Sequence, residues 1–256
     1  MRILVTGSGG CLGRALLALA RRRGADLVGL RHEDCDVSDP AARERALDLH
    51  RPDAVLFAAA FTAVDRCASD PRAAAVNVEA PAAWAARVPT WWISTNYVFH
   101  TPGPHAPSAR PTPEGAYAGQ KAEAERRVLA AGGHVARVGW VLGPGGRTFG
   151  STLAGRLRRG EVVQAIWDVP VQPTWSEDLA EALLALPEGV THHIGAGETS
   201  WYGLALAVRE RLRVGTVVPV RQAEVPFVDP RPWDARLLPA RLRPWWQWVD
   251  QLAALP

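Results

Sequence analysis

Apolar positions in the first 145 residues alternate between short runs, which are typical of buried strands, and longer stretches with helical spacing. We expect helices over residues 10–23, 40–50, 73–87 (bent or divided at Pro81) and 116–131. The expected strands cover residues 2–6, 26–30, 54–59, 92–94 and 134–142. Strands that alternate with helices in this way predict a parallel sheet with helices on both faces.

The alternation is less regular after residue 146. We expect an extended segment at 162–167 and a strand at 192–194 that returns to the sheet. The tail, residues 231–256, is rich in Pro and Trp and ends in an amphipathic segment. The expected helices of this half cover residues 148–159, 176–186 and 201–212.

The first strand runs directly into a G-x-x-G-x-x-G motif, and a helix follows it. The motif comprises Gly7, Gly10 and Gly13, with Cys11 and Leu12 between the last two glycines. Without side chains the backbone can turn tightly and approach a diphosphate, while the helix N-terminus supplies free N–H groups and partial positive charge. This context predicts a dinucleotide-binding site, although a tight turn without a ligand would have the same glycines.

The residues that follow the second strand indicate which dinucleotide binds. An acidic side chain at this position would accept from the adenosine 2′-hydroxyl, whereas a basic one favours a 2′-phosphate. Arg31 and His32 occupy it here, so NADP(H) is the preferred expectation, and NAD(H) stays open because two acidic residues come next. Asp36 and Val37 are candidates for the adenine edge; a simple turn before the next helix is the alternative.

We therefore expect an α/β fold, a doubly wound parallel sheet of the Rossmann type with a smaller mixed C-terminal domain. The dinucleotide-binding domain would comprise residues 1–145 and about 174–197. The smaller, substrate-binding domain would comprise residues 146–173 and 198–256.

A tyrosine and the chain's single lysine have Y-x-x-x-K spacing. Tyr117 and Lys121 share one face of the predicted helix. A free tyrosine, with a pKa of about 10, is a poor proton donor near neutrality, but a nearby ammonium favours its phenolate form. This spacing alone is common and without meaning in most chains. An ordinary surface lysine could have been arginine, however, as it is at every other Lys/Arg position of the chain, so we expect Lys121 to have a chemical task for which a guanidinium is unsuited. The pair predicts proton exchange with a carbonyl or alcohol oxygen.

Hydroxyl groups follow the fourth strand, at the edge of the sheet where parallel sheets bind their ligands. Thr95 is the candidate that would hold the substrate oxygen beside Tyr117, with Ser94 as its competitor. An ordinary polar end of a strand is the alternative to both.

Composition excludes several classes of protein. The 29 Lys+Arg against 26 Asp+Glu give a net charge of only +3, and the block Arg21–Arg23 is typical of a solvated helix end, so we expect no nucleic-acid partner. No apolar run reaches the length of a membrane span, and residues 1–7 predict a strand and turn rather than a signal peptide. The cysteines, Cys11, Cys35 and Cys67, are odd in number and lack metal-type spacing, which favours a reduced, cytoplasmic protein without a metal site.

Taken together, these motifs resemble those of the extended short-chain dehydrogenase/reductases, and within them the dTDP-4-dehydrorhamnose reductase family, over nearly the whole chain. The similar segments are residues 51–53 and 58–65 (RPD…AAAFTAVD), 94–99 (STNYVF), 137–140 (RVGW), 168–174 (DVPVQPT), 200–202 (SWY) and 231–232 (RP).

The resemblance implies roles for individual residues. Thr95, Tyr117 and Lys121 would be the catalytic trio, with Tyr117 and Lys121 also contacting the cofactor. The implied reaction is hydride transfer from NADP(H) to the C4 ketone of a nucleotide-linked 4-keto-6-deoxy sugar, with Tyr117 as proton donor. The remaining implied site residues are Ala60, Phe61 and Thr62 along the cofactor, Asn77 as support, and Asn96 and Trp140 facing the substrate. The resemblance is also compatible with a homodimer.

Departures from the family pattern fall on the substrate side. Asn96 stands where the family has Asp, and Val169 and Val171 replace Gln and Gly. Two alternatives therefore stay open: a non-catalytic, cofactor-binding regulatory subunit, and a sugar-nucleotide epimerase.

Overall fold

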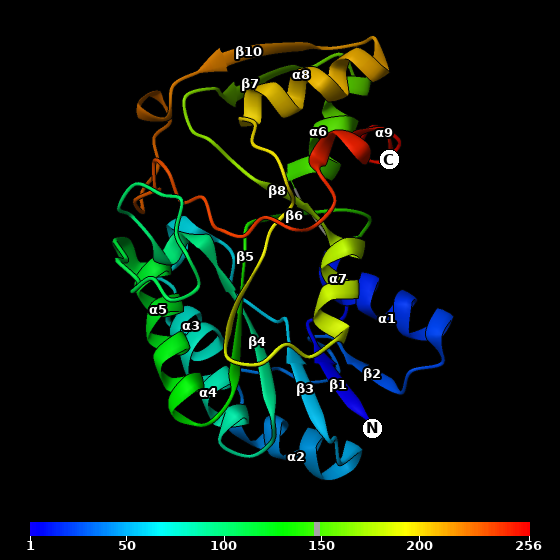
Figure 1. Ribbon diagram of the computed structural model, residues 1–256, viewed down its shortest axis with the longest axis vertical. Helices are drawn as coiled ribbons and strands as arrows, with labels where there is room; N and C mark the ends of the chain where they lie inside the picture. Colours follow the sequence, from blue (N-terminus) through cyan, green and yellow to red (C-terminus); the bar gives the residue numbers. More distant parts are fainter. Residues whose placement is uncertain (146–148) are drawn as a thin grey trace.

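A computed structural model of the chain describes residues 1–145 and 149–256. The expected start of a helix at Thr148 and the expected domain boundary at residue 146 lie outside the described residues. Within the described chain, six strands form one parallel sheet in the order β2-β1-β3-β4-β5-β9 (Figure 1). These strands are β1 (Ile3–Thr6), β2 (Leu27–Leu30), β3 (Ala54–Phe57), β4 (Thr90–Thr95), β5 (His134–Val138) and β9 (Val190–His193).

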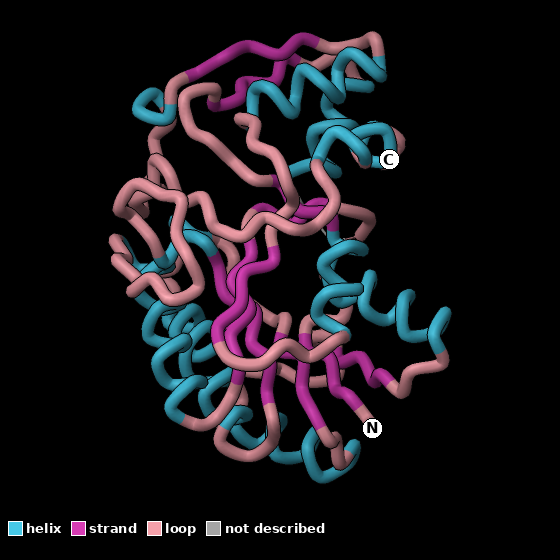
Figure 2. Tube along the Cα trace, in the orientation of Figure 1, coloured by secondary structure: helices cyan, strands magenta, loops and turns pink. Residues whose placement is uncertain are grey.

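Helices cover both faces of this sheet, as the alternating pattern predicts. On one face α1 (Cys11–Arg23) packs beside α7 (Ser176–Leu184), and their leucines share a buried cluster with β1 and β3. On the other face lie α2 (Pro40–His50), α4 (Ala80–Ala85) and α5 (Gly115–Ala130). The result is the doubly wound, Rossmann-like fold, with its layers visible in Figure 2.

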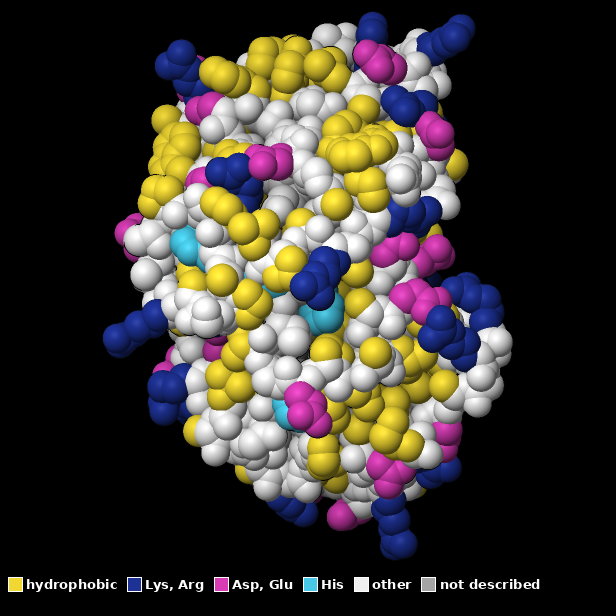
Figure 3. Space-filling view, in the orientation of Figure 1, with side chains coloured by type: hydrophobic (Ala, Val, Ile, Leu, Met, Phe, Trp, Pro, Cys, Tyr) yellow, Lys and Arg dark blue, Asp and Glu magenta, His cyan; other side chains and the backbone are white. Residues whose placement is uncertain are grey.

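Local sequence determines where several helices begin and end. Asp39 accepts from the N–H of Ala41 at 2.9 Å and caps α2, and Gly24 ends α1 in a left-handed conformation at φ 66°. The last turn of α1 carries Arg21–Arg23, all exposed, and Figure 3 shows basic side chains gathered over this helix. This basic block is thus a solvated helix end.

A second, smaller lobe lies beyond the carboxyl ends of the strands (Figures 1 and 2). Two pairs of parallel strands accompany its helices, β7 with β10 and β6 with β8. Its core contains the buried Trp175 and Trp248, whose rings stack at 5.2 Å. The elements are β6 (Trp140–Leu142), α6 (Phe149–Arg158), β7 (Val162–Ile166), β8 (Pro173–Trp175), α8 (Trp201–Leu212), β10 (Thr216–Val220) and α9 (Val249–Ala253).

The expected strand over residues 134–142 is two strands. After Val138 the chain leaves the main sheet at Gly139, and Trp140–Leu142 pair with Pro173–Trp175 instead. Both halves are apolar, so hydrophobic periodicity does not distinguish one strand from two. The sequence reading also missed β8 and β10.

The expected helix over residues 73–87 is divided. It consists of α3 (Pro71–Ala74), a π-helical segment (Ala75–Glu79) and α4, in which Pro81 occupies the first turn. The N–H of Ala80 donates to the carbonyl of Ala75, which is the wider π spacing. The α-helical bonding is therefore divided next to Pro81, which is one of the two outcomes expected for this helix.

Candidate active site

The glycine turn packs against the carboxyl end of β3 so closely that side chains would not fit. A Cβ on Gly7, whose φ is +66°, would lie 2.8 Å from the Ala59 nitrogen, and one on Gly13 would lie 2.5 Å from the Gly7 carbonyl oxygen. Gly10 precedes α1 without any side-chain cap, so the first N–H groups of the helix stay available. A backbone shaped in this way fits the diphosphate of a dinucleotide.

An open cleft of about 570 Å³ extends from this turn. Its walls include Arg31, Asp36 and Val37 at one end and Ala60, Phe61 and Thr62 at the other. Gly7, Gly10, Cys11, Leu12 and Gly13 form its floor. All the cofactor-side residues singled out in the sequence, apart from Tyr117 and Lys121, thus line one cleft.

Basic side chains lie at the Arg31 end of the cleft. His32 and Arg72 join Arg31 there, and Arg72 pairs with Asp70 at 2.7 Å. Hydrogen bonds from Ser38 hold the pKa of Asp36 below its usual value, so its carboxylate is charged. Sequence reasoning missed Arg72, because nothing in its local sequence connects the start of α3 with the end of β2.

Tyr117 lines neither the cofactor cleft nor a second cavity, but it is buried in a cluster that borders both. It belongs to a small buried cluster that includes Phe61 from the cleft wall, and Val64 and Tyr97 from the second cavity. Its ring meets that of Tyr97 edge to face at 6.1 Å. Burial raises the pKa of Tyr117 to about 12, opposed by a hydrogen bond with Thr95. The structure therefore favours the protonated phenol, whereas the sequence argument stressed the phenolate.

Lys121 is almost completely buried one turn after Tyr117. Its Nζ donates to the carbonyl of Ile93 at 2.8 Å and lies 3.8 Å from the centroid of the Trp92 ring. Burial lowers the pKa of Lys121 to about 7, while the nearby carboxylate of Glu125 raises it. The ammonium and the neutral amine are thus close in free energy near neutral pH.

Ser94 and Thr95 point to different environments. The Ser94 hydroxyl donates to Glu125 at 2.6 Å, and Glu125 forms a buried ion pair with Arg137 at 2.7 Å. Thr95, by contrast, lies close enough to Tyr117 to lower the pKa of its phenol, and its Oγ1 accepts from the N–H of Tyr97 at 3.2 Å. Of the two hydroxyls proposed from the sequence, the structure places Thr95 beside the tyrosine.

Asn77 supports the cofactor side from the π-helical segment. Its side chain is hydrogen-bonded to both the N–H and the carbonyl of Phe61, at 2.9 and 3.1 Å, and donates to Gln120 at 3.0 Å. It therefore connects the Phe61 wall of the cleft to the helix that carries Tyr117 and Lys121.

The second cavity, of about 270 Å³, lies between the two lobes and shares Thr62 with the cofactor cleft. Asn96 and Trp140, which the resemblance places on the substrate side, both line it. Asn96 donates to the carbonyl of Ala235 at 3.1 Å. Further lining residues come from distant parts of the chain, and the sequence analysis gave no role to Tyr97, Ile166, Gln222 or Phe227.

Across the described residues, no helix combines the length and the hydrophobicity needed to cross a bilayer. Within the same ranges, no group of three or more His, Cys, Asp or Glu side chains is placed to hold a metal ion.

Comparisons with known proteins agree with this geometry. Residues 1–247 match a family described as RmlD substrate binding domain. A dTDP-4-dehydrorhamnose reductase of Mycobacterium tuberculosis is 38% identical over 253 residues, covering 90% of this chain and 82% of the relative. A probable dTDP-4,6-dihydroxy-2-methyloxan-3-one 4-ketoreductase of Streptomyces antibioticus is 37% identical over 252 residues, covering 91% and 85%.

Solved structures show the same fold. The crystal structure of a dTDP-4-dehydrorhamnose reductase from Clostridium acetobutylicum superimposes with a TM-score of 0.89, at 25% identity, and the alignment covers 100% of this chain and 98% of that one. A Bacillus anthracis protein of the same name, crystallised with NADP, has a TM-score of 0.88 at 22% identity and shares the fold, with coverage of 99% and 98%. The chain therefore belongs to the RmlD family of extended short-chain dehydrogenase/reductases and is an NAD(P)-dependent oxidoreductase of that type.

Proposed function

We propose that this oxidoreductase reduces the C4 ketone of a nucleotide-linked 4-keto-6-deoxy sugar with NADP(H). The observation that carries the proposal is the place of Tyr117, in a buried cluster against which Phe61 of the cofactor cleft and Tyr97 of the second cavity both pack. A ketone in that cavity would approach the tyrosine from one side and the cofactor from the other. The names of the relatives support a sugar nucleotide as the substrate.

The residues of the chain have separate tasks in this proposal. The cofactor, when bound, supplies the hydride. Tyr117 donates its phenolic proton to the ketone oxygen, and burial suits it to this task because the phenol stays protonated. Thr95 orients that oxygen through its hydroxyl. Lys121 contacts the cofactor ribose and, when charged, stabilises the phenolate that remains after proton transfer.

NADP(H) is the proposed cofactor because Arg31, His32 and Arg72 surround one end of the cleft. Guanidinium groups bind a phosphate through charged, directional hydrogen bonds. The described structure is that of one chain, and a homodimer remains our proposal from the family resemblance, as do the two domains with the boundaries given above.

The direct test is oxidation of NADPH in the presence of a dTDP-4-keto-6-deoxyhexose. We expect turnover by the wild-type chain and a loss of about 10²–10⁴-fold in Tyr117→Phe, the range for removal of a general acid. Tyr202→Phe is the matched control, since Tyr202 packs against the core of the smaller lobe. Tight cofactor retention without net NADPH consumption would indicate an epimerase. Absence of turnover on a panel of sugar nucleotides would favour a regulatory subunit.

A further inference from the structure

The helix that carries Tyr117 and Lys121 is capped by a residue from a distant part of the chain. Asp229 accepts from the N–H of Ala116 at 2.7 Å and from the N–H of Tyr117 at 3.2 Å, one carboxylate oxygen for each. The side chain of Glu114, which precedes the helix, makes no capping hydrogen bond. A buried carboxylate thus satisfies two of the free N–H groups of α5 from a position more than a hundred residues away.

The start of α5 is shaped to receive this carboxylate. Gly115 has φ +81°, a backbone conformation that side chains rarely adopt. A Cβ at Gly115 would lie 2.7 Å from Oδ1 of Asp229. Residue 115 therefore leaves the space above the helix end open, and Asp229 fills it.

Asp229 belongs to a short segment, residues 227–231, which we call the clasp. Oδ1 of Asp65, which follows β3, accepts from the N–H groups of Val228 and Asp229 and from Arg231, each at 3.0 Å. Arg231 also donates to the carbonyl of Asp229 at 2.6 Å. These bonds hold the clasp against the sheet lobe, and they do not involve the side chain of Asp229 that caps α5.

The clasp also forms part of the wall of the second cavity, the proposed substrate cavity. Phe227 and Arg231 line that cavity, and the guanidinium of Arg231 lies 4.5 Å from the centroid of the Phe227 ring. The carbonyl of Arg231 accepts from Gln222, another lining residue, at 3.2 Å. One continuous segment thus contacts both the substrate cavity and the backbone of the proposed proton donor.

We propose that Asp229 is a positioning residue for Tyr117, which couples the wall of the substrate cavity to the placement of the proton donor. Loss of the cap would release the first turn of α5 and displace the phenol, while the cofactor cleft, built from other elements, stays intact. The inference rests on the proposed function for its kinetic part. Its structural part, restraint of the two N–H groups by Asp229, is independent of the substrate.

The test compares Asp229→Ala and Asp229→Asn with the wild-type chain. We expect kcat to fall about 10–100-fold in Asp229→Ala, because small displacements of a reacting group have effects of this size, with KM for NADPH within about twofold. Asp229→Asn keeps one acceptor oxygen, so we expect its kcat to fall only about threefold. A kcat that decreases from wild type to Asp229→Asn to Asp229→Ala would indicate that the cap positions Tyr117. Amide hydrogen exchange at Ala116 and Tyr117 should accelerate in the same order.

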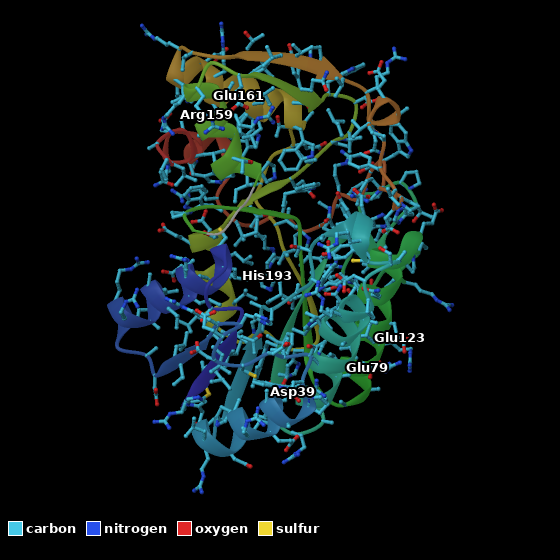
Figure 4. All side chains as sticks on the ribbon, turned by 180° about the vertical axis from the view of Figure 1, so that it is seen from behind. Asp39, Glu79, Glu123, Arg159, Glu161 and His193 are labelled. Atoms are coloured by element: carbon cyan, nitrogen blue, oxygen red, sulfur yellow. The ribbon has the colours of Figure 1, made fainter. Side chains whose placement is uncertain are left out.

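Asp39→Ala is the matched control, since it removes a cap from α2, a helix of the sheet lobe that does not carry Tyr117 (Figure 4). We expect a comparable loss of stability but unchanged kcat. The proposal is overturned if Asp229→Ala retains the kcat of this control, or if exchange at the two amides is unchanged. Should Asp229→Ala not fold, wild-type kcat and exchange in Asp229→Asn would overturn it. If the wild-type chain reduces no sugar nucleotide, the proposed function fails, and amide exchange alone decides whether Asp229 restrains the helix.

Discussion

The ammonium of Lys121 lies 3.8 Å from the centroid of the Trp92 ring, and Trp92 is fully buried on the neighbouring strand β4. The two residues therefore form a cation–π pair out of contact with water, where such an interaction contributes about 2 kcal/mol. Burial favours the neutral amine, whereas the ring and the carboxylate of Glu125 favour the charged form. The protonation state of the proposed catalytic lysine thus depends on an aromatic side chain that lines neither the cofactor cleft nor the second cavity.

Trp92→Leu is expected to lower the pKa of Lys121 below about 7, because the charged form loses the ring. The proposed mechanism uses the charged lysine, so the decline of kcat on the alkaline side should begin at lower pH. Trp92→Phe keeps an aromatic face, so the pKa of Lys121 should fall less than in Trp92→Leu. Trp84→Leu is the control, since Trp84 is equally buried but lies over no ammonium. A profile of kcat against pH that is the same in Trp92→Leu and Trp84→Leu would contradict this role.

Ser94 and Thr95 should separate stability from catalysis. Ser94→Ala removes a hydrogen bond to the buried carboxylate of Glu125, so we expect the free energy of unfolding to fall by about 1–3 kcal/mol with kcat unchanged. Thr95→Val keeps the shape but removes the hydroxyl beside Tyr117, and kcat should fall about 100-fold. Denaturant unfolding and steady-state kinetics on both variants check this. A larger kcat loss in Ser94→Ala would reverse the assignment.

Arg31 should discriminate between the two nicotinamide cofactors. We expect Arg31→Ala to raise KM for NADPH about tenfold and to leave KM for NADH unchanged, because a hydrogen bond to a charged group contributes about 1.5–3 kcal/mol. Arg45→Ala, an exposed arginine outside the cofactor cleft, is the control. Equal effects on the two cofactors would show that Arg31 does not contact a 2′-phosphate.

His192 should make the protein less stable in mild acid. It lies buried beside Arg137 and is hydrogen-bonded to the carbonyl of Leu238 at 2.9 Å. Burial lowers its pKa to about 4. In the unfolded chain the pKa is about 6.5, so the unfolded state binds a proton that the native state does not, and stability falls as the pH drops from about 6.5 to 4.

We therefore expect His192→Gln to unfold with a smaller pH dependence than the wild-type chain between these values. Urea unfolding at a series of pH values measures the pH dependence of the free energy of unfolding. His32→Gln is the comparison, because it replaces a histidine whose side chain is 81% exposed. An identical pH dependence in His192→Gln and the wild-type chain would contradict the assignment.

Residues close together in the chain were predicted well. The glycine turn, the helix over residues 40–50 with its cap Asp39, and the Tyr117–Lys121 spacing each depend on a few consecutive residues. Backbone sterics and the helical period determine them locally, so the sequence alone determined the doubly wound fold and the strand–turn–helix that lines the cofactor cleft.

Features that depend on contacts between distant segments were decided only by the tertiary structure. The division of residues 134–142 into two strands depends on pairing with Pro173–Trp175, and the cap on α5 depends on Asp229. The choice between Ser94 and Thr95 depends on Glu125, which is on another element. Local patterns carry no information about such partners, because folding brings them together only through burial and hydrogen bonding across the chain.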